Sequence, residues 1–322
     1  DLMEMWITGV IKKLKPLERM KDSCKGVAHD ECFTKLLDYV ASDGERYPEE
    51  ECLAPHILEK EFKKIGYKIL KPKIFDTSKY GVPQTRKRVI FLAYSKKVKK
   101  PNFPKQTCKK PVSLVEAIGD FYDEKYSSDY IANRKASCNI THNFERSTIN
   151  LITSERFSLY RDGECTNDVK SRLQTEGLDL TNCPNLTELL SISLNLSKTQ
   201  VLNKASKGRL GKKGIDILLT KKNVRKKLSK NKPAQTVVTI RDDYINPFNN
   251  QIFTVRELAR FQSFDDDFVF YGKRTTGGQM RKKETPQYTQ VGNAVPPLFS
   301  FALANNIFRL YASINKFSTI CF

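Results

Sequence analysis

The sequence lacks several features that would place it in a common class of protein. None of its eight cysteines forms a Cys-x-x-Cys pair, which argues against a zinc ribbon or a redox pair. The cysteines are scattered, as free thiols are in a reducing compartment. No apolar run approaches a membrane span, and the first residues lack the pattern of a signal peptide. We therefore expect an intracellular protein with no membrane partner, in the cytoplasm or nucleoid, or in the nucleus of a eukaryote.

Acidic residues are few relative to basic ones. The 322-residue chain has 36 Asp and Glu against 56 Lys and Arg, giving a net charge of +20, and its mean hydropathy is −0.50. This basic excess favours a polyanionic partner, because Lys and Arg bind phosphates and release counterions. A nucleic acid is the leading candidate. Charge alone also fits a ribosomal or heparin-like binder, or a genome whose codons favour lysine.

Residues 54–95 contain a regular succession of apolar patterns. Apolar residues recur at helical spacing over 58–65, and Gly66 follows as a stop signal. Residues 67–75 (YKILKPKIF) form a candidate strand, and a turn with glycine and proline comes next. Residues 89–94 (VIFLAY) are a continuous apolar run, as expected of a strand covered on both faces. This order predicts part of an α/β sheet.

The middle of the chain has a weaker pattern, in which short apolar stretches alternate with Asn, Ser and Thr. Residues 203–232 hold twelve Lys or Arg and one acid, so this span carries +11 of the net charge. Such a run is usually a mobile, solvated surface. It could equally be a loop or ribbon on DNA, and the apolar residues 215–219 indicate partial order. The second alternative makes five residues candidate DNA contacts: Lys204, Lys207, Arg209, Lys212 and Lys213.

Three further helices have clear signals. Residues 111–118 predict a short helix after a polar connection. Thr254 is a candidate N-cap with Glu257 three residues later, which forms a capping box before an apolar face. Residues 298–310 are apolar on most sides, so the helix there should be buried.

Two short loops carry polar side chains that suit ligand binding. In residues 80–88 (YGVPQTRKR), Gln84, Arg86 and Arg88 alternate and should point the same way. Two guanidinium groups on one edge suit a phosphate or a base carbonyl, although such pairs usually form surface salt bridges. In residues 290–297 (QVGNAVPP), the glycine allows close backbone approach and the asparagine offers a donor and an acceptor. By itself this second pattern is only a helix start.

In this order, with residues 254–268 (TVRELARFQSFDDDF) between them, the two loops resemble the late motifs of the DNA cytosine-5 methyltransferases. The first loop resembles the eighth motif of that family. This resemblance implies that Arg86 contacts the flipped cytosine and a nearby phosphate. It also places Gln84 and Arg88 beside the DNA, where Gln84 supports the loop and Arg88 is mainly structural.

The second loop resembles the tenth motif, in which the asparagine and the next residue line the S-adenosylmethionine pocket. Asn293 and Ala294 are therefore the candidate cofactor-binding residues. The stretch between the loops resembles the ninth motif, which organises the target recognition domain. The resemblance gives Arg256, Glu257 and Arg260 an architectural role, as a network on the helix surface that fixes the orientation of this domain.

The family's sixth motif, Glu-Asn-Val at a strand end, has one weak candidate in the opening DLMEMWITG. The carboxyl group of Glu4 would hydrogen-bond the ring nitrogen of cytosine and assist proton transfer. Met5 and Trp6 replace the asparagine and valine of the motif. An acid this close to the start of a sequence is more often simply exposed, so both interpretations remain open.

The family's early motifs are absent from the sequence. The chemistry needs a thiolate that attacks carbon 6 of cytosine, from a cysteine that follows a proline. None of the eight cysteines follows a proline, and Cys183-Pro184 has the reverse order. The chain could be a subunit of a split enzyme, a C-terminal fragment, or a degenerate homologue. The first two are favoured because an incomplete sheet and a bare helix face would expose apolar surface, which predicts a second polypeptide or a missing segment with the Pro-Cys nucleophile.

The resemblance implies an α/β fold, with a partial Rossmann-like methyltransferase sheet and a smaller, mixed target recognition domain. The expected domains are the second half of the catalytic domain at 1–105, the recognition domain at 106–240, and a segment at 241–322 that returns to the catalytic domain. The expected function is methyl transfer from S-adenosylmethionine to carbon 5 of a flipped cytosine in duplex DNA, within restriction-modification, with this chain inactive alone. The alternative is a non-catalytic DNA-binding module.

Overall fold

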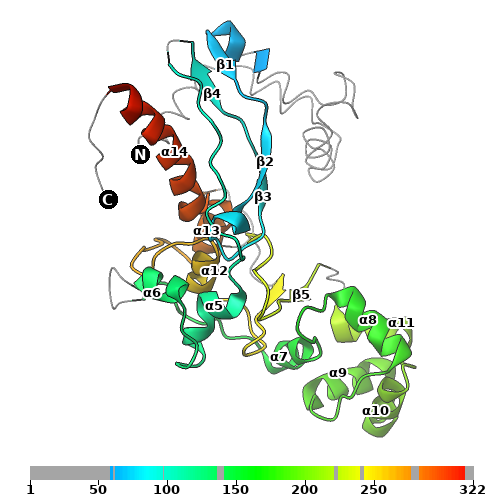
Figure 1. The fold of residues 1–322 in the computed structure, drawn as a ribbon. Coiled ribbons are helices and arrows are strands. Elements are labelled where there is room, and N and C mark those ends of the chain that lie inside the picture. The colour runs from blue at the N-terminus through cyan, green and yellow to red at the C-terminus, as the bar shows by residue number, and fades with distance from the viewer. Residues whose placement is uncertain are drawn as a thin grey trace. The chain divides into compact units, whose positions relative to one another are not determined.

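The computed structural model describes residues 59–60, 62–96, 98–135, 141–220, 224–239, 243–276 and 283–315 (Figure 1). They divide into two compact units. The first unit holds the described residues of 1–76, 87–105 and 302–322, and the second holds those of 77–86 and 106–301. The predicted domain boundaries at 105 and 240 are functional divisions, and they remain predictions.

The first unit contains a long antiparallel ribbon. Strand β1 (Tyr67–Ile69) pairs with β4 (Ala93–Ser95), and β2 (Lys73–Asp76) pairs with β3 (Lys87–Ile90). A hydrogen bond from Leu70 N–H to Leu92 O, 2.9 Å long, continues the pairing between the two ladders. Residues 77–86, which connect β2 with β3 in the chain, belong to the second unit.

The prediction of two continuous strands in this region was wrong. The stretch 67–75 is interrupted around Pro72, which has no N–H to donate to a ladder, and 89–94 is divided between β3 and β4. The apolar run 89–94 is half-buried throughout, because each described strand pairs with only one other described strand. The helix predicted before this ribbon is confirmed. Its described residues among 59–64 are helical, and Gly66 follows with a φ of +86°.

The second unit is mostly helical. Its elements are η1 (Thr77–Tyr80), α5 (Leu114–Ile118), η2 (Gly119–Phe121), α6 (Asp129–Lys135), α7 (Leu151–Ser158), α8 (Thr166–Thr175), α9 (Pro184–Leu194), α10 (Lys198–Ser206), α11 (Gly211–Leu219), β5 (Lys226–Lys227), β6 (Tyr244–Ile245), α12 (Val255–Phe261) and α13 (Gln287–Asn293). Helix α14 (Pro297–Asn315) begins in this unit and continues in the first. The mixed α/β content, with strands in two-stranded sheets, agrees with the predicted fold class.

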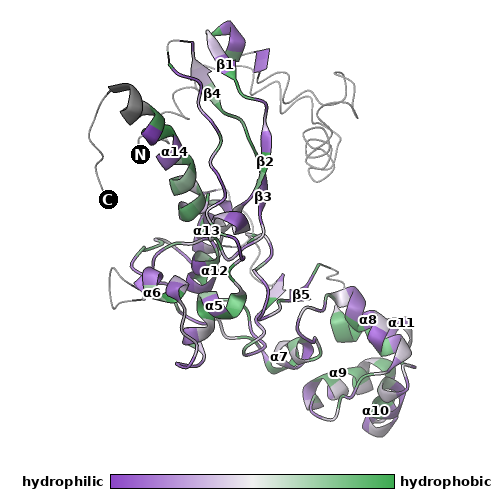
Figure 2. Ribbon diagram, viewed as in Figure 1, coloured by the Kyte–Doolittle hydropathy of each residue, from purple (hydrophilic) through white to green (hydrophobic). Residues whose placement is uncertain are grey.

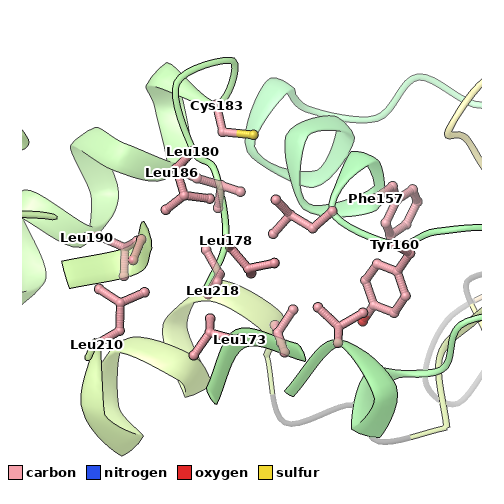
Figure 3. Close-up of a cluster of buried hydrophobic side chains, with 14 of the residues drawn as sticks. Phe157, Tyr160, Leu173, Leu178, Leu180, Cys183, Leu186, Leu190, Leu210 and Leu218 are labelled. Carbon is pink, nitrogen blue, oxygen red and sulfur yellow. The ribbon is translucent and has the colours of Figure 1, made fainter. Parts of the chain in front are cut away.

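Helices α7–α11 form a bundle around an apolar core of their own (Figure 3). Leu173, Leu190 and Leu218 are completely buried in it. Each helix carries both hydrophobic and hydrophilic residues (Figure 2). The sequence pattern did not predict these helices, because the polar residues that interrupt it are helix caps. Asn150 accepts a backbone hydrogen bond at the start of α7, and Ser197 does so at the start of α10.

A separate core lies among α5, α12 and α13. Leu114, Val255 and Val291 are completely buried there. The predicted helix at 111–118 is confirmed as α5, and the capping box of Thr254 and Glu257 is confirmed at the start of α12. This second core carries the segments that resemble methyltransferase motifs.

The helix predicted at 298–310 is confirmed as α14, but its predicted burial was wrong. Phe299 is buried, whereas Phe301 is 64% exposed and both Ile307 and Phe308 are 46% exposed. Figure 2 shows the hydrophobic residues along the first turns of this helix. An apolar pattern shows only that a helix can be buried. Within the described residues, no element covers the exposed apolar side chains of α14.

Candidate functional site

The turn at residues 81–86 is held by hydrogen bonds to residues 234–239, the segment that follows the helical bundle in the chain. Ala234 N–H donates to the carbonyl oxygen of Pro83 (2.9 Å), and Thr85 N–H donates to that of Ala234 (2.8 Å). Gln84 and Ala234 thereby form a parallel bridge. The backbone that carries the candidate base-binding residues is thus fixed within the second unit.

Helix α13 also lies against the segment 234–239. A Cβ atom added to Gly292 would be 3.1 Å from the backbone nitrogen of Thr239 and the carbonyl carbon of Val238. Side chains rarely accept so short a distance to backbone, so glycine permits this approach. The two candidate segments are far apart in the sequence, and both contact the segment 234–239.

Two buried glutamine side chains link these parts. Gln84 Nε2 donates to Gln262 Oε1 (2.8 Å), and Val237 N–H donates to Gln84 Oε1 (2.6 Å). Gln262 Nε2 in turn donates to the carbonyl oxygen of Val291 in α13 (2.7 Å). Both side chains are completely buried. This placement favours the supporting role of Gln84 over a contact with DNA.

Arg86 lies beside this network. Its side chain is 8% exposed, and its Nη1 is 3.5 Å from the carbonyl oxygen of Val237. Gln84 and Arg86 both reach Val237, as their period-two spacing predicts. Arg88 belongs to the first unit, where it lies opposite Phe75 in the β2–β3 ladder, and burial lowers the pKa of its guanidinium.

Asn293 and Ala294 lie at the end of α13. Asn293 is exposed, whereas Ala294 is half-buried in extended backbone with φ −63° and ψ 149°. Ala294 N–H donates to the carbonyl oxygen of Val291 (3.2 Å), which fixes the chain where it leaves the helix. The amide of Asn293 therefore faces solvent from a rigid position and can donate and accept hydrogen bonds.

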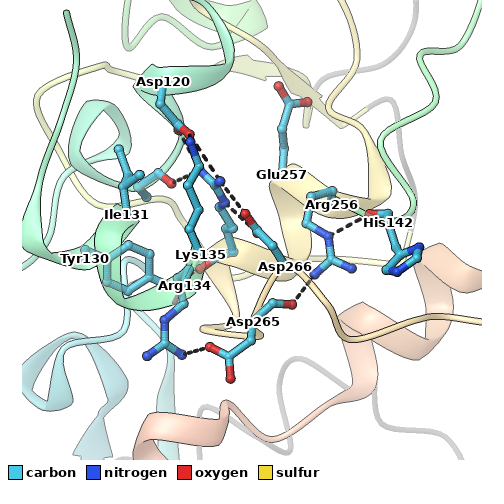
Figure 4. A network of polar contacts seen from close by, with 12 residues as sticks. Asp120, Tyr130, Ile131, Arg134, Lys135, His142, Arg256, Glu257, Asp265 and Asp266 are labelled. Atoms are coloured by element: carbon cyan, nitrogen blue, oxygen red, sulfur yellow. Dashed lines mark hydrogen bonds and ion pairs between the residues drawn. The ribbon is translucent and has the colours of Figure 1, made fainter. Parts of the chain in front are cut away.

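The arginine of the ninth-motif stretch with the most partners is Arg260, near the end of α12. Its partners include Asp120 and Asp266, which belong to the polar network in Figure 4. Its guanidinium donates to both carboxylate oxygens of Asp266 (2.9 and 2.6 Å) and of Asp120 (2.6 and 3.2 Å). It also donates to the carbonyl oxygen of Ala117 (3.1 Å) and lies 3.8 Å from the centre of the Phe121 ring. Burial alone lowers the pKa of Arg260, but Asp266 and Asp120 leave it above its ordinary value.

Arg256 and Glu257 occupy other faces of the same helix. Arg256 donates to the carbonyl oxygens of His142 (2.8 Å), Asp265 (2.6 Å) and Phe268, and burial lowers its pKa to about 10. Glu257 accepts from the Tyr122 hydroxyl. Burial raises the pKa of Glu257, although Tyr122 and other hydrogen-bond donors lower it.

The prediction that these three residues form a network on the helix surface was wrong, because Arg256, Glu257 and Arg260 are completely buried. Besides Thr254 and Asn246, which bond Glu257, their partners come from residues 117–146 and from 265–268. The network therefore joins segments that the bundle separates in the sequence. Buried guanidinium groups are costly unless every donor is paired, and all five N–H donors of Arg260 are. The role predicted for these residues is still architectural.

The five candidate DNA contacts in the basic run lie on helices and the turn between them. Neither sequence alternative, a mobile solvated run or a loop or ribbon on DNA, predicted these helices: the described part of the run comprises the end of α10, a turn, α11 and then the short strand β5 with loop residues around it. Val201, Ala205, Leu218 and Leu219 are buried in the bundle core, whereas the five basic side chains are exposed. They lie at the end of α10, in the turn, and in the first turn of α11: Lys204, Lys207, Arg209, Lys212 and Lys213.

An open hollow of about 570 Å³ adjoins this turn. It is lined by Lys212, Lys213, Asp216 and Ile217. Lysines in the first turn of a helix are unfavourable beside its positive end, unless an anion binds there. The combination of exposed lysines, a helix N-terminus and a hollow therefore suits a phosphate group.

One candidate site residue cannot be located in the structure. Glu4 lies outside the described residues. Among the residues that the structure does describe, no group of three or more His, Cys, Asp or Glu is arranged to bind a metal ion. Within the same residues, no helix has both the length and the apolar character needed to cross a membrane.

Sequence reasoning missed two parts of the site. Gln262 lies inside the quoted ninth-motif stretch, but its sequence gave no sign of its link to α13. The segment 234–239 (AQTVVT) was not singled out, although its β-branched residues favour an extended conformation. Both were hidden because their partners are more than 25 residues away in the chain.

Comparison with known proteins identifies the family of this chain. The C-5 cytosine-specific DNA methylase family matches residues 49–309, so the chain belongs to this family. The type II methyltransferase M.DdeI of Desulfomicrobium norvegicum is 31% identical over 282 residues, which cover 80% of this chain and 59% of that protein. M1.HphI of Haemophilus parahaemolyticus, also a type II methyltransferase, is 26% identical and matches 78% of this chain and 50% of its own length.

Shorter and more distant likenesses also occur. The type II methyltransferase M.AquIB of Picosynechococcus sp. is 38% identical over 108 residues, covering 33% of this chain and 78% of that protein. A solved structure described as a DNA modification methyltransferase encoded within a prophage (E. coli) covers 80% of this chain and 65% of its own, with 19% identity and a TM-score of 0.47. The chain spans 59% and 50% of the lengths of M.DdeI and M1.HphI.

Proposed function

We propose that this chain supplies the base-binding, cofactor-side and DNA-recognition parts of a DNA cytosine-5 methyltransferase. One observation carries the proposal: the turn with Arg86 and the end of α13 with Asn293 both lie against residues 234–239. A base-modifying enzyme needs its base and its methyl donor close together, and this segment holds the candidate groups for both. The family membership supports the reaction class.

Arg86 is the proposed contact to the extruded cytosine. Because it is mostly buried and held near Val237, its guanidinium is oriented before substrate arrives. A fixed guanidinium can donate to a base carbonyl or to the adjacent phosphate, and cytosine must leave the duplex for the reaction. Gln84 then supports the turn from within.

Asn293 and Ala294 are the proposed contacts to S-adenosylmethionine. The residues fit, because the exposed amide of Asn293 offers the donor and acceptor that the charged amino-acid end of this cofactor needs. Gly292 brings the same helix end against the segment that holds Arg86. When bound, the cofactor supplies the methyl group. The protein groups on this side hold and orient it.

The nucleophilic thiolate is proposed to come from a segment or polypeptide outside this sequence. No cysteine here follows a proline, and the one cysteine in the second unit's bundle core, Cys183, is buried with a pKa that burial raises. The exposed apolar residues of α14, Phe301, Ile307 and Phe308, support a protein partner for this helix. The companion would then carry the Pro-Cys nucleophile and the glycine-rich cofactor motif.

Reconstitution tests this proposal. Co-expressed with a companion segment or polypeptide that carries a Pro-Cys motif, the chain should transfer labelled methyl groups from S-adenosylmethionine to cytosine in duplex DNA. The chain alone should bind DNA without methylating it, because it lacks the thiolate. Methylation by the purified chain alone would contradict the external nucleophile. Salt-sensitive DNA binding with no activity beside any companion would identify a non-catalytic DNA-binding module.

The exposed basic side chains at the α10–α11 turn are the proposed phosphate contacts of the recognition region. Replacing all five by glutamine should weaken DNA binding and make the slope of log affinity against log salt shallower by up to about 4. Deleting the run would be uninformative, because Leu210 and Leu218 belong to the bundle core. Electrophoretic titrations at several salt concentrations measure the slope.

A matched control removes the same charge elsewhere. Five exposed lysines in the first unit and its neighbouring connection can be replaced by glutamine together: Lys96, Lys99, Lys100, Lys105 and Lys109. This control should leave the slope nearly unchanged. An equal change in both variants would show that net charge, and not the α10–α11 turn, determines the salt dependence.

A further inference from the structure

The buried amides of Gln84 and Gln262 form part of an uninterrupted hydrogen-bonded connection between the two halves of the proposed site. The connection starts at Arg86, whose Nη1 contacts the carbonyl oxygen of Val237 (3.5 Å), and Val237 N–H donates to Gln84 Oε1 (2.6 Å). Gln84 Nε2 donates to Gln262 Oε1 (2.8 Å), and Gln262 Nε2 donates to the carbonyl oxygen of Val291 (2.7 Å). Two residues after Val291, the helix ends at Asn293.

The direction of every bond in this connection is determined. A backbone N–H can only donate, so Val237 requires the oxygen of Gln84 to face it, and this turns Gln84 Nε2 toward Gln262. Gln262 must then accept with its oxygen, which leaves its Nε2 to donate to the carbonyl oxygen of Val291. Reversing either amide would place two donors or two acceptors together. The connection is therefore formed as a whole or broken as a whole.

The surroundings make a broken connection costly. Gln84 and Gln262 are both completely buried, so no solvent can replace a lost partner. A buried polar group without a partner costs more than an ordinary hydrogen bond contributes. Two apolar side chains at these positions would leave Val237 N–H without the oxygen to which it donates. Two amides in a fixed order instead specify one position of the Arg86 turn relative to α13.

We infer that Gln84 and Gln262 are positioning residues that couple the placement of Arg86 to that of the α13 end, so that the base side and the cofactor side of the site are set together. This inference rests on the proposed function. Neither glutamine touches substrate in this arrangement, because both lie inside the protein. Their effect on the reaction passes through Val237 on one side and Val291 on the other.

Glutamate substitutions test the coupling, because they keep the size and the accepting oxygen but remove the donor. Gln262→Glu should break the bond to Val291, and Gln84→Glu should break the bond to Gln262. In the reconstituted enzyme at about pH 9, each should raise the KM for S-adenosylmethionine about 10-fold, while the Kd for DNA changes less than about twofold. At about pH 6 the KM should return toward the wild-type value, because a protonated buried carboxyl regains a donor.

Gln287→Glu is the matched control. Gln287 is a buried glutamine in α13, and its Nε2 donates to the carbonyl oxygen of Gly272 (2.8 Å), outside the connection. It should not show the pH-dependent change in KM. In amide hydrogen exchange on the full chain without cofactor, Gln84→Glu should speed exchange in α13, although Gln84 is far from α13 in the sequence.

The outcomes separate this inference from the proposed function. If the wild-type complex does not methylate DNA, the proposed function is wrong, and the exchange experiment still tests the coupling. If the wild-type complex is active but all three glutamate variants change KM alike, or Gln84→Glu leaves exchange in α13 unchanged, the two amides only fill space and the coupling is refuted.

Discussion

Replacing Arg86 by alanine should lower kcat/KM for methylation by the reconstituted enzyme about 100- to 1000-fold, the range found when a single fixed donor is removed from a reacting site. The guanidinium is 8% exposed and oriented beside Val237, so no other described side chain on that turn can replace it. The Kd for DNA should change less than about threefold, because the remaining phosphate contacts are retained. Steady-state kinetics and DNA titrations on one preparation measure both quantities.

Two further variants make this result specific. Lys87→Ala removes a positive charge from the next residue, which is exposed, and should leave kcat/KM within about twofold. Arg86→Lys keeps the charge but loses the planar fork, so it should recover little activity. Equal losses of methylation and DNA affinity in Arg86→Ala would show that this arginine only anchors a phosphate. Thermal unfolding of each variant separates these effects from misfolding.

Replacing Arg260 by methionine should destabilise the second unit by about 3–5 kcal/mol, because it leaves buried Asp120 and Asp266 without their shared partner. Both carboxylates are at least 92% buried, at 8% and 1% exposed, and each makes two bonds to the guanidinium. The unfolding temperature of the corresponding transition should fall by about 10 °C or more. Differential scanning calorimetry on the full chain measures it.

The control for Arg260 comes from the same cluster. Lys135 also pairs with Asp120, at 2.7 Å, but its side chain is 48% exposed. Lys135→Ala should therefore change stability by less than about 1 kcal/mol. A small effect of Arg260→Met, similar to that of the control, would mean that water reaches the two carboxylates and that the network does not hold α12 in place.

The sequence predicted those features of the fold that depend on residues close together in the chain. Capping residues act locally, so Thr254 at the start of α12 could be identified from its neighbours in the chain. The loop predicted at 290–297 was wrong in part, because residues 290–293 belong to helix α13. The burial of Arg260 could not be predicted, because it depends on Asp120, 140 positions away. Charged residues in a helix usually predict an exposed face. Here the hydrogen-bond and ion-pair partners of these residues allow them to be buried.

The largest errors in the predicted fold also arise because local sequence does not specify distant contacts. The helices of the bundle are short and bury few residues each, and their caps contribute Asn and Ser that look like loop signals. The apolar run at 89–94 has the composition of a covered strand, but composition does not state what covers it. Similarly, the apolar residues of α14 predicted burial, whereas Phe301 is exposed in the described part of the chain.

The two apolar cores of the second unit have a consequence for how such a protein can diversify. The bundle's leucines form one cluster, and the residues of α5, α12 and α13 form another. Surface changes on α10 and α11 therefore leave the second cluster, and the groups it carries, undisturbed. Under the proposed function, new sequence preferences could arise on the bundle by ordinary substitution, while the groups carried by the second cluster keep their positions.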